Sequence, residues 1–166
     1  MVSMGEKETQ IIMKIASTAF DHGETIPRQY SRDAEDKNPP LHITAVPANA
    51  RSLVLIMDDP DAPRGTFTHW VVFDIDPKLT IIGEDHVPDK ARQGANGWGE
   101  SNYGGPRPPS GEHRYFFRLY ALDTKLDLQA GSSREEVERA MQGHVIEQAE
   151  TMGRFASTQP QPAGRH

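Results

Sequence analysis

The stretch LVLIMDDPDAPRGTFTHWVVFDID, which runs from Leu53 to Asp76, carries most of the fold prediction for this chain. It contains two mostly apolar runs, Leu53–Met57 and Thr68–Ile75, that flank a short loop rich in aspartate and proline. Short runs of this kind, bounded by turn residues, predict β-strands. Because the first run is apolar at every position, it predicts a central strand covered on both faces. The polar residues of the loop are then expected at the mouths of these strands.

Other short runs also predict strands, and clusters of Pro, Gly, Asn and Asp separate them. They are Ile11–Phe20, Leu41–Val46, Ser52–Asp58 and His113–Leu122. This spacing predicts a mainly β fold, an antiparallel sandwich or barrel. A single domain over residues 11–156 is expected, with flexible tails at residues 1–10 and 157–166.

One helix is predicted near the C-terminal end of the chain. Ser132 and Ser133 offer an N-cap, and Glu135 and Glu136 fall in the first turn, where the helix dipole favours negative charge. Gly153 is expected to end the helix. The apolar stripe of this helix would consist of Val137, Ala140, Met141, Val145, Ala149 and Met152.

The segment Gly83–Glu112 shows little periodicity and is rich in glycine. Long loops inside compact domains are usually functional or disordered. Trp98, Tyr103 and the rigid prolines near its end favour a packed loop that forms the wall of a pocket.

Composition limits the classes of function that the chain can have. Of 166 residues, 18 are Lys or Arg and 24 are Asp or Glu, so the net charge is −6. This charge disfavours binding to nucleic acid or to anionic membrane surfaces. The absence of cysteine excludes disulfides, thiolate catalysis and Cys-ligated zinc. No apolar segment is long enough for a membrane span, and no signal peptide is recognisable, so a cytoplasmic protein is expected.

Two histidines and a tyrosine are the candidate site residues on the strands. In an extended strand, His113 and Tyr115 share one face, which continues as apolar core. His69 stands in the same way at the start of its strand, and a lone histidine there would be read as a core-edge residue. Two such histidines, with Asp59 and Asp61 ahead of one of them, predict a shared polar pocket. The face of His69 is expected to continue through Val71, Phe73 and Ile75.

Three aspartates, Asp58, Asp59 and Asp61, lie too close together for all to have the same role, because like charges raise one another's pKa. One is expected to be structural, as Asp often is in turns, and one to face the pocket. Asp58 is expected to lie outside the site.

Four kinds of site remain open on residue type alone. They are a metal site with two histidines and one carboxylate, a carboxylate-pair hydrolase, a triad with Ser110, and a non-catalytic anion pocket. The ligand spacing is not that of a compact metal site, and Ser110 lacks a nucleophile-elbow context.

Three motifs resemble those of the phosphatidylethanolamine-binding protein (PEBP) family, particularly its bacterial and archaeal branch of Raf-kinase-inhibitor-like, YbhB/YbcL-type proteins. They are DPDAP at Asp59–Pro63, the pair His69-Trp70, and GPRPPSGEHRY at Gly105–Tyr115. The resemblance implies a Greek-key antiparallel β-sandwich with one or two peripheral helices. It further implies a regulatory protein without catalysis, cofactor or metal, with a kinase or protease partner and a homodimeric state.

The same resemblance implies which residues bind a small anion or a phosphorylated head group. The ligand-binding residues would be Asp59, Asp61, His69, Gly105, Pro106, His113 and Tyr115, with Pro60 and Trp70 in the pocket wall. Because histidine titrates near neutrality, anion affinity is expected to rise as the pH falls. A cis peptide bond is also expected before Pro63 or Pro106.

Overall fold

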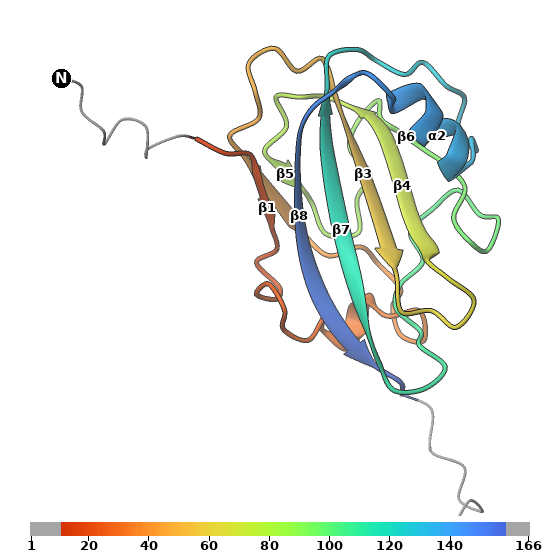
Figure 1. Ribbon diagram of the computed structural model, residues 1–166. Coiled ribbons are helices and arrows are strands. Elements are labelled where there is room, and N and C mark those ends of the chain that lie inside the picture. The colour runs from red at the N-terminus through yellow and green to blue at the C-terminus, as the bar shows by residue number, and fades with distance from the viewer. Residues whose placement is uncertain (1–10, 159–166) are drawn as a thin grey trace, which may run out of the picture.

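The computed structural model describes residues 11–158, so the expected tails lie outside the described residues except for Ser157 and Thr158. Two antiparallel sheets form a sandwich, which confirms the predicted fold class (Figure 1). The larger sheet has the order β6-β4-β3-β7-β8 and the smaller one β1-β2-β5. The strands are β1 (Lys14–Ala16), β2 (Leu41–Thr44), β3 (Ser52–Asp59), β4 (Phe67–Ile75), β5 (Ile81–Ile82), β6 (Arg92–Gln93), β7 (Glu112–Leu122) and β8 (Val145–Ala156).

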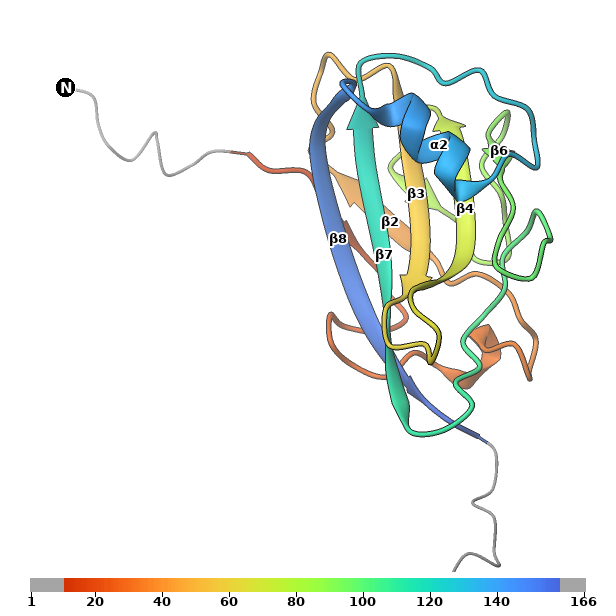
Figure 2. The same cartoon turned by 45° about the vertical axis from the view of Figure 1, so that its right-hand side comes forward.

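The predicted central strand is confirmed, because every residue of β3 is buried. One face of β3 points into the large core between the two sheets, which contains Leu53, Leu55 and Met57. The other face, with Val54 and Ile56, packs in a smaller cluster with the helix α2 (Arg134–Met141). Figure 2 shows α2 lying across the outer face of the larger sheet. A short 3₁₀ helix, η1 (Arg28–Tyr30), is the second peripheral helix.

The helix prediction is right at its start and wrong at its end. Ser133 caps α2 through a reciprocal capping box with Glu136, but α2 ends at Met141. Gly143 follows with a φ of +81°, a conformation that suits glycine and stops a helix. The rest of the expected helix is the strand β8, whose residues pair with β7. Gly153 lies inside β8, where an added Cβ would overlap Ile26 of the core.

Two smaller expectations are also corrected. Only Lys14–Ala16 of the expected strand Ile11–Phe20 pairs with a neighbouring strand. The peptide bonds before Pro63 and Pro106 are trans, as are all others among residues 11–158. Across the described part of the chain, neither helix is long and apolar enough to cross a membrane.

Strand β4 contains a bulge at His69 that decides where this side chain points. Trp70 pairs with Met57 of β3, whereas Thr68 pairs with the next residue, Asp58, so His69 is an extra residue. A bulge of this kind interrupts the strict alternation of side chains between the two faces of a sheet.

The prediction that His69 shares a face with Val71 and Phe73 is therefore wrong, whereas Ile75 does lie in the large core. Val71 and Phe73 pack in the cluster beneath α2, whereas Trp70 lies in the large core. The ring of His69 contacts Tyr115, a large-core residue of β7, with ring centroids 5.1 Å apart. His69 thus reaches the side of the sheet on which Tyr115 lies.

Candidate functional site

A cavity of about 290 Å³ opens where β3 ends and where β4 and β7 begin. We call it the histidine pocket, because His69 and His113 both line it. Four of the predicted site residues come together here: Asp59, His69, His113 and Tyr115. The remaining lining residues are Ala62, Pro63, Phe67, Trp98, Arg107, Pro108 and Pro109.

His113 and Asp59 form a buried pair in this pocket. Nδ1 of His113 lies 2.6 Å from Oδ2 of Asp59, and the two side chains are 10% and 5% exposed. The other oxygen of Asp59 accepts a hydrogen bond from the backbone N–H of Asp61, which fixes the carboxylate at the strand end. Because Nδ1 of His113 is engaged, its Nε2 atom is the nitrogen left to meet a ligand.

His69 is held by the backbone of the long loop. Its Nδ1 lies 2.7 Å from the carbonyl oxygen of Gly104, and its own carbonyl accepts a hydrogen bond from the N–H of Gly104. Burial lowers the pKa of His69, although the Gly104 and Gly105 carbonyls and the Asp59 carboxylate act in the opposite direction. This histidine is therefore neutral at neutral pH.

No well-formed hydrogen bond is found for the buried hydroxyl of Tyr115, although the Asp59 carboxylate and the Arg107 backbone lie close enough to affect its pKa. Burial, reinforced by the nearby charge of Asp59, raises the pKa of Tyr115 far above its ordinary value, so the group keeps its proton. Buried polar groups are nearly always paired in folded proteins, and an exception calls for an explanation. A hydroxyl at the wall of a cavity is suited to bind a ligand oxygen.

Arg107 is a lining residue that sequence reasoning overlooked. It lies within the quoted motif GPRPPSGEHRY, between two prolines, and its side chain pairs with Asp33 at 3.1 Å. Its side chain is 54% exposed, and it brings a positive charge to the rim of the histidine pocket. An arginine held between rigid prolines was the signal in the sequence that could have identified it.

The other two aspartates lie outside the pocket. Asp61 receives two hydrogen bonds from the guanidinium of Arg114 and one from its backbone N–H. The side chain of Arg114 holds the pKa of Asp61 at about 2. Asp58 is buried on the opposite face of the sheet, where it binds Arg118 and Arg134. Asp59 is thus the aspartate that faces the pocket.

Four other predicted residues do not line the histidine pocket. Trp70 points into the large core between the two sheets, because the bulge sets its orientation. Its indole N–H donates to Gln93 at 2.7 Å. Pro60 lies in the turn after β3 but outside the lining. Gly105 and Pro106 also lie outside the lining and contact the segment after η1. The N–H of Gly105 donates to Asp36, and the carbonyl of Pro106 accepts from the N–H of Arg32.

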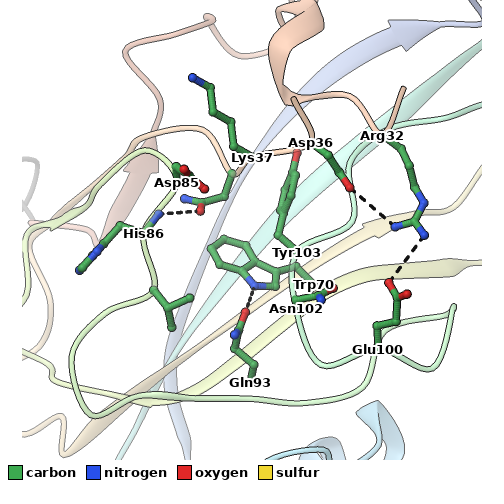
Figure 3. Close-up of a pocket in the computed structure, with 12 residues that line it drawn as sticks. Arg32, Asp36, Lys37, Trp70, Asp85, His86, Gln93, Glu100, Asn102 and Tyr103 are labelled. Carbon is green, nitrogen blue, oxygen red and sulfur yellow. Dashed lines mark hydrogen bonds and ion pairs between the residues drawn. The ribbon is translucent and has the colours of Figure 1, made fainter. Parts of the chain in front are cut away.

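A second cavity, of about 460 Å³, is lined by Glu100, Asn102 and Tyr103 of the long loop whose Trp98 lines the histidine pocket. Figure 3 shows the residues of this second cavity. Its charged groups are largely paired with one another. Arg32 contacts Asp36 and Glu100, and Lys37 contacts Glu84. Because these charges neutralise each other, the smaller histidine pocket, which holds the Tyr115 hydroxyl, is the stronger candidate for the functional site.

The Arg32 network supports the wall of the histidine pocket. Its guanidinium lies 3.8 Å from the ring centre of Trp98, a lining residue. The carboxylate of Asp36 accepts a hydrogen bond from the N–H of Gly105 at 2.7 Å. Burial raises the pKa of Asp36, against the opposing effects of the Gly105 N–H and of Arg32. Arg32 and Asp36 of the second cavity therefore hold the loop that also forms part of the wall of the histidine pocket.

The fold and the site define a β-sandwich protein with a small pocket at one end of its larger sheet, where a few polar side chains stand among mostly apolar lining residues. Residues 16–156 match the family model described as phosphatidylethanolamine-binding protein. A "UPF0098 protein" of Methanothermobacter thermautotrophicus is 50% identical over 149 residues, which cover 86% of this chain and 98% of that protein. Another of Aquifex aeolicus is 46% identical, with 87% and 88% covered.

Two crystal structures show the same fold. A PEBP homologue from Chlamydia trachomatis has a TM-score of 0.86 and 39% identity, covering 89% of this chain and 99% of that one. YbcL of E. coli, described as a member of the mammalian PEBP family, has a TM-score of 0.82 and 26% identity, with 88% and 99% covered. The chain belongs to the phosphatidylethanolamine-binding protein family, as its motifs predicted.

Proposed function

We propose that this protein binds a small phosphate-like oxyanion in the histidine pocket and does not transform it. The observation that carries the proposal is the buried hydroxyl of Tyr115, which lines the pocket together with His113. A hydroxyl donor and the open Nε2 of a histidine are groups that oxyanions bind. Arg107 at the rim has five N–H donors, so it can bind a ligand oxygen while it pairs with Asp33 at 3.1 Å.

The carboxylate of Asp59 opposes an anion, and its pairing with His113 reduces this effect. A protonated His113 would form an ion pair with Asp59 and still donate from Nε2 to the ligand. Burial keeps His69 neutral at neutral pH, so this histidine adds no charge to the pocket. The carboxylate thus orients a donor instead of attacking a substrate.

A hydrolase is the second candidate, and one observation favours it. The Asp59–His113 pair has the geometry of an oriented general base. However, none of the residues that line the pocket is a serine, threonine, cysteine or lysine. Such an enzyme would have to activate water directly. Assays with chromogenic phosphate and carboxylate esters on wild-type protein and His113→Ala would reveal it.

Calorimetric titration with inorganic phosphate tests the binding proposal. Wild-type protein should bind phosphate, and His113→Ala should bind at least about tenfold more weakly, since a lost charge-assisted hydrogen bond costs about 1.5–3 kcal/mol. His144→Ala is the matched control, because His144 pairs with Asp123 at 2.8 Å on the surface, away from the pocket. No phosphate binding to the wild type, or an equal loss in both variants, would refute the proposal.

Family membership supports three further proposals about the biological context. They are a regulatory role toward a kinase or protease partner, a homodimeric state and a cytoplasmic location. Light scattering of the purified protein tests the dimer, and affinity capture compared with His113→Ala tests whether a partner depends on the pocket. A monomer at working concentrations would contradict the dimer.

A further inference from the structure

The tautomer of His69 is determined by its contact with Gly104. Nδ1 lies 2.7 Å from the carbonyl oxygen of Gly104. A carbonyl oxygen has no proton to donate, so Nδ1 must carry the hydrogen of this bond. The N–H of Gly104 in turn donates to the carbonyl of His69 at 3.0 Å. These two bonds hold the imidazole ring and the loop in one relative position.

The carbonyl of Gly104 is itself held in place. The next residue, Gly105, donates its N–H to Asp36, and the carbonyl of Pro106 accepts a hydrogen bond from the backbone of Arg32 at 3.0 Å. Figure 3 shows Asp36 and Arg32 paired with each other among the residues that line the second cavity. The peptide that faces His69 is therefore anchored from behind and has little freedom to rotate.

With its proton on Nδ1, a neutral His69 carries a lone pair on Nε2. Among the described residues, Nδ1 is the atom of this ring for which a hydrogen bond is found. The groups that could change its protonation are Asp59 at the end of β3, His113 and Tyr115 on β7, and Arg107 in the loop. Burial outweighs the attraction of the Asp59 and Asp58 carboxylates and lowers the pKa of His69. Nε2 is thus a hydrogen-bond acceptor in a pocket proposed for anions.

We propose that Nε2 of His69 accepts a hydrogen bond from a protonated ligand oxygen, so that the pocket selects oxyanions that bear an O–H group. The inference rests on the proposed function and specifies its ligand class. Inorganic phosphate and the monoanion of a phosphate monoester are such oxyanions. Sulfate carries no proton near neutral pH, and it would place an acceptor against the lone pair of His69.

The pocket would therefore distinguish oxyanions by whether they carry a proton and not by their size. Sulfate and phosphate share a tetrahedral shape, but an acceptor facing an acceptor leaves a buried polar group unpaired. We expect sulfate to bind at least about tenfold more weakly than phosphate. This factor lies in the lower part of the range that an unpaired buried polar group costs in binding free energy. A monoester loses its last proton near pH 6, so its affinity should fall above about pH 6 relative to that of inorganic phosphate.

Calorimetry of the full chain in a buffer free of oxyanions tests the inference. Inorganic phosphate and sulfate are titrated at neutral pH, and methyl phosphate is compared with inorganic phosphate at about pH 5.5 and pH 8. The ratio of the last two affinities cancels any titration of the protein, since both ligands meet the same groups. The inference expects phosphate to exceed sulfate about tenfold and the methyl phosphate ratio to fall on going to higher pH.

Equal binding of phosphate and sulfate, or a constant methyl phosphate ratio, would overturn the inference and leave the proposed function standing. Absence of binding by every anion would overturn both. His69→Asn replaces the acceptor by an amide that can donate, so its preference for phosphate over sulfate should shrink. A preference unchanged in folded His69→Asn would also count against the role of His69. The wild-type ratios decide the question if this variant does not fold.

Discussion

The backbone N–H of Asp61 donates a hydrogen bond to Oδ1 of Asp59 at 2.8 Å, and yet the two carboxylates have different roles. Asp59 faces the pocket and holds His113, whereas Asp61 binds Arg114 on the outer surface. The first carboxylate is nearly excluded from solvent, and the second is 30% exposed. The turn after β3 thus separates an aspartate that faces the pocket from one that binds Arg114 at the surface.

This separation predicts a contrast between Asp59→Asn and Asp61→Asn. Removing the charge of Asp59 should weaken phosphate binding about tenfold, because His113 loses the carboxylate that orients it. Asp61→Asn should change the affinity less than twofold, by about 0.4 kcal/mol. Calorimetry on both variants checks this. Tighter binding by Asp59→Asn would show that repulsion of the anion by Asp59 dominates.

Tyr115→Phe should affect stability and binding in opposite directions. The variant removes a buried hydroxyl that has no well-formed hydrogen bond, so the free protein should gain about 1 kcal/mol, or about 2–4 °C in Tm. It should also lose part of the thermal stabilisation that phosphate gives to the wild type. Thermal melts with and without phosphate measure both effects. A destabilised variant would indicate that the hydroxyl is hydrogen-bonded in the free protein.

Gly105→Ala should destabilise the protein by at least about 2 kcal/mol, since overpacking typically costs 1–3 kcal/mol. A Cβ at Gly105 would overlap the carbonyl oxygen of Tyr30, which is backbone and cannot move aside. Gly83→Ala is the control in the same long loop, because its Cβ would meet no atom closer than 3.7 Å. Chemical denaturation of the two variants makes the comparison, and similar losses would contradict the close approach at Gly105.

Asp58→Ala should cost about 3 kcal/mol of stability, because it leaves Arg118 and Arg134 without their buried carboxylate. Glu150→Ala, which removes an exposed partner of Arg118, should cost less than about 1 kcal/mol. If Asp58→Ala remains folded, its phosphate affinity should equal that of the wild type. A selective loss of binding would place Asp58 in the site after all.

Asp61 predicts a pH dependence of stability. Its pKa falls from the ordinary 3.8 to about 2 in the folded protein, mainly through the side-chain hydrogen bonds of Arg114. A carboxyl group whose pKa is lower in the folded protein stabilises the fold at pH values above its unfolded pKa. This contribution is lost as the pH falls toward about 2. The effect should be small, because the pair is partly exposed. Unfolding measurements on wild type and Asp61→Asn should therefore converge near pH 2, and a constant difference would contradict the mechanism.

The sequence predicted which polar residues share one pocket better than it predicted the ends of some elements. Asp59, His69, His113 and Tyr115 could be identified because each stands at a strand end, next to apolar runs that are read locally. The strand β8 was mistaken for helix, because its apolar residues also fit a helical period. The pairing of β8 with β7 and the left-handed backbone of Gly143 make this segment a strand, because tertiary contacts override local preference.

By itself, then, the sequence determined the family, the sandwich of short strands and the residue types of the pocket. Only the tertiary structure decided which aspartate faces the pocket, because Asp59 meets His113 across 54 residues of chain. It also decided the tautomer of His69, through a β-bulge and through a carbonyl 35 residues away. Alternation and motif spacing are local properties, whereas bulges and hydrogen-bond partners follow from the way distant segments pack.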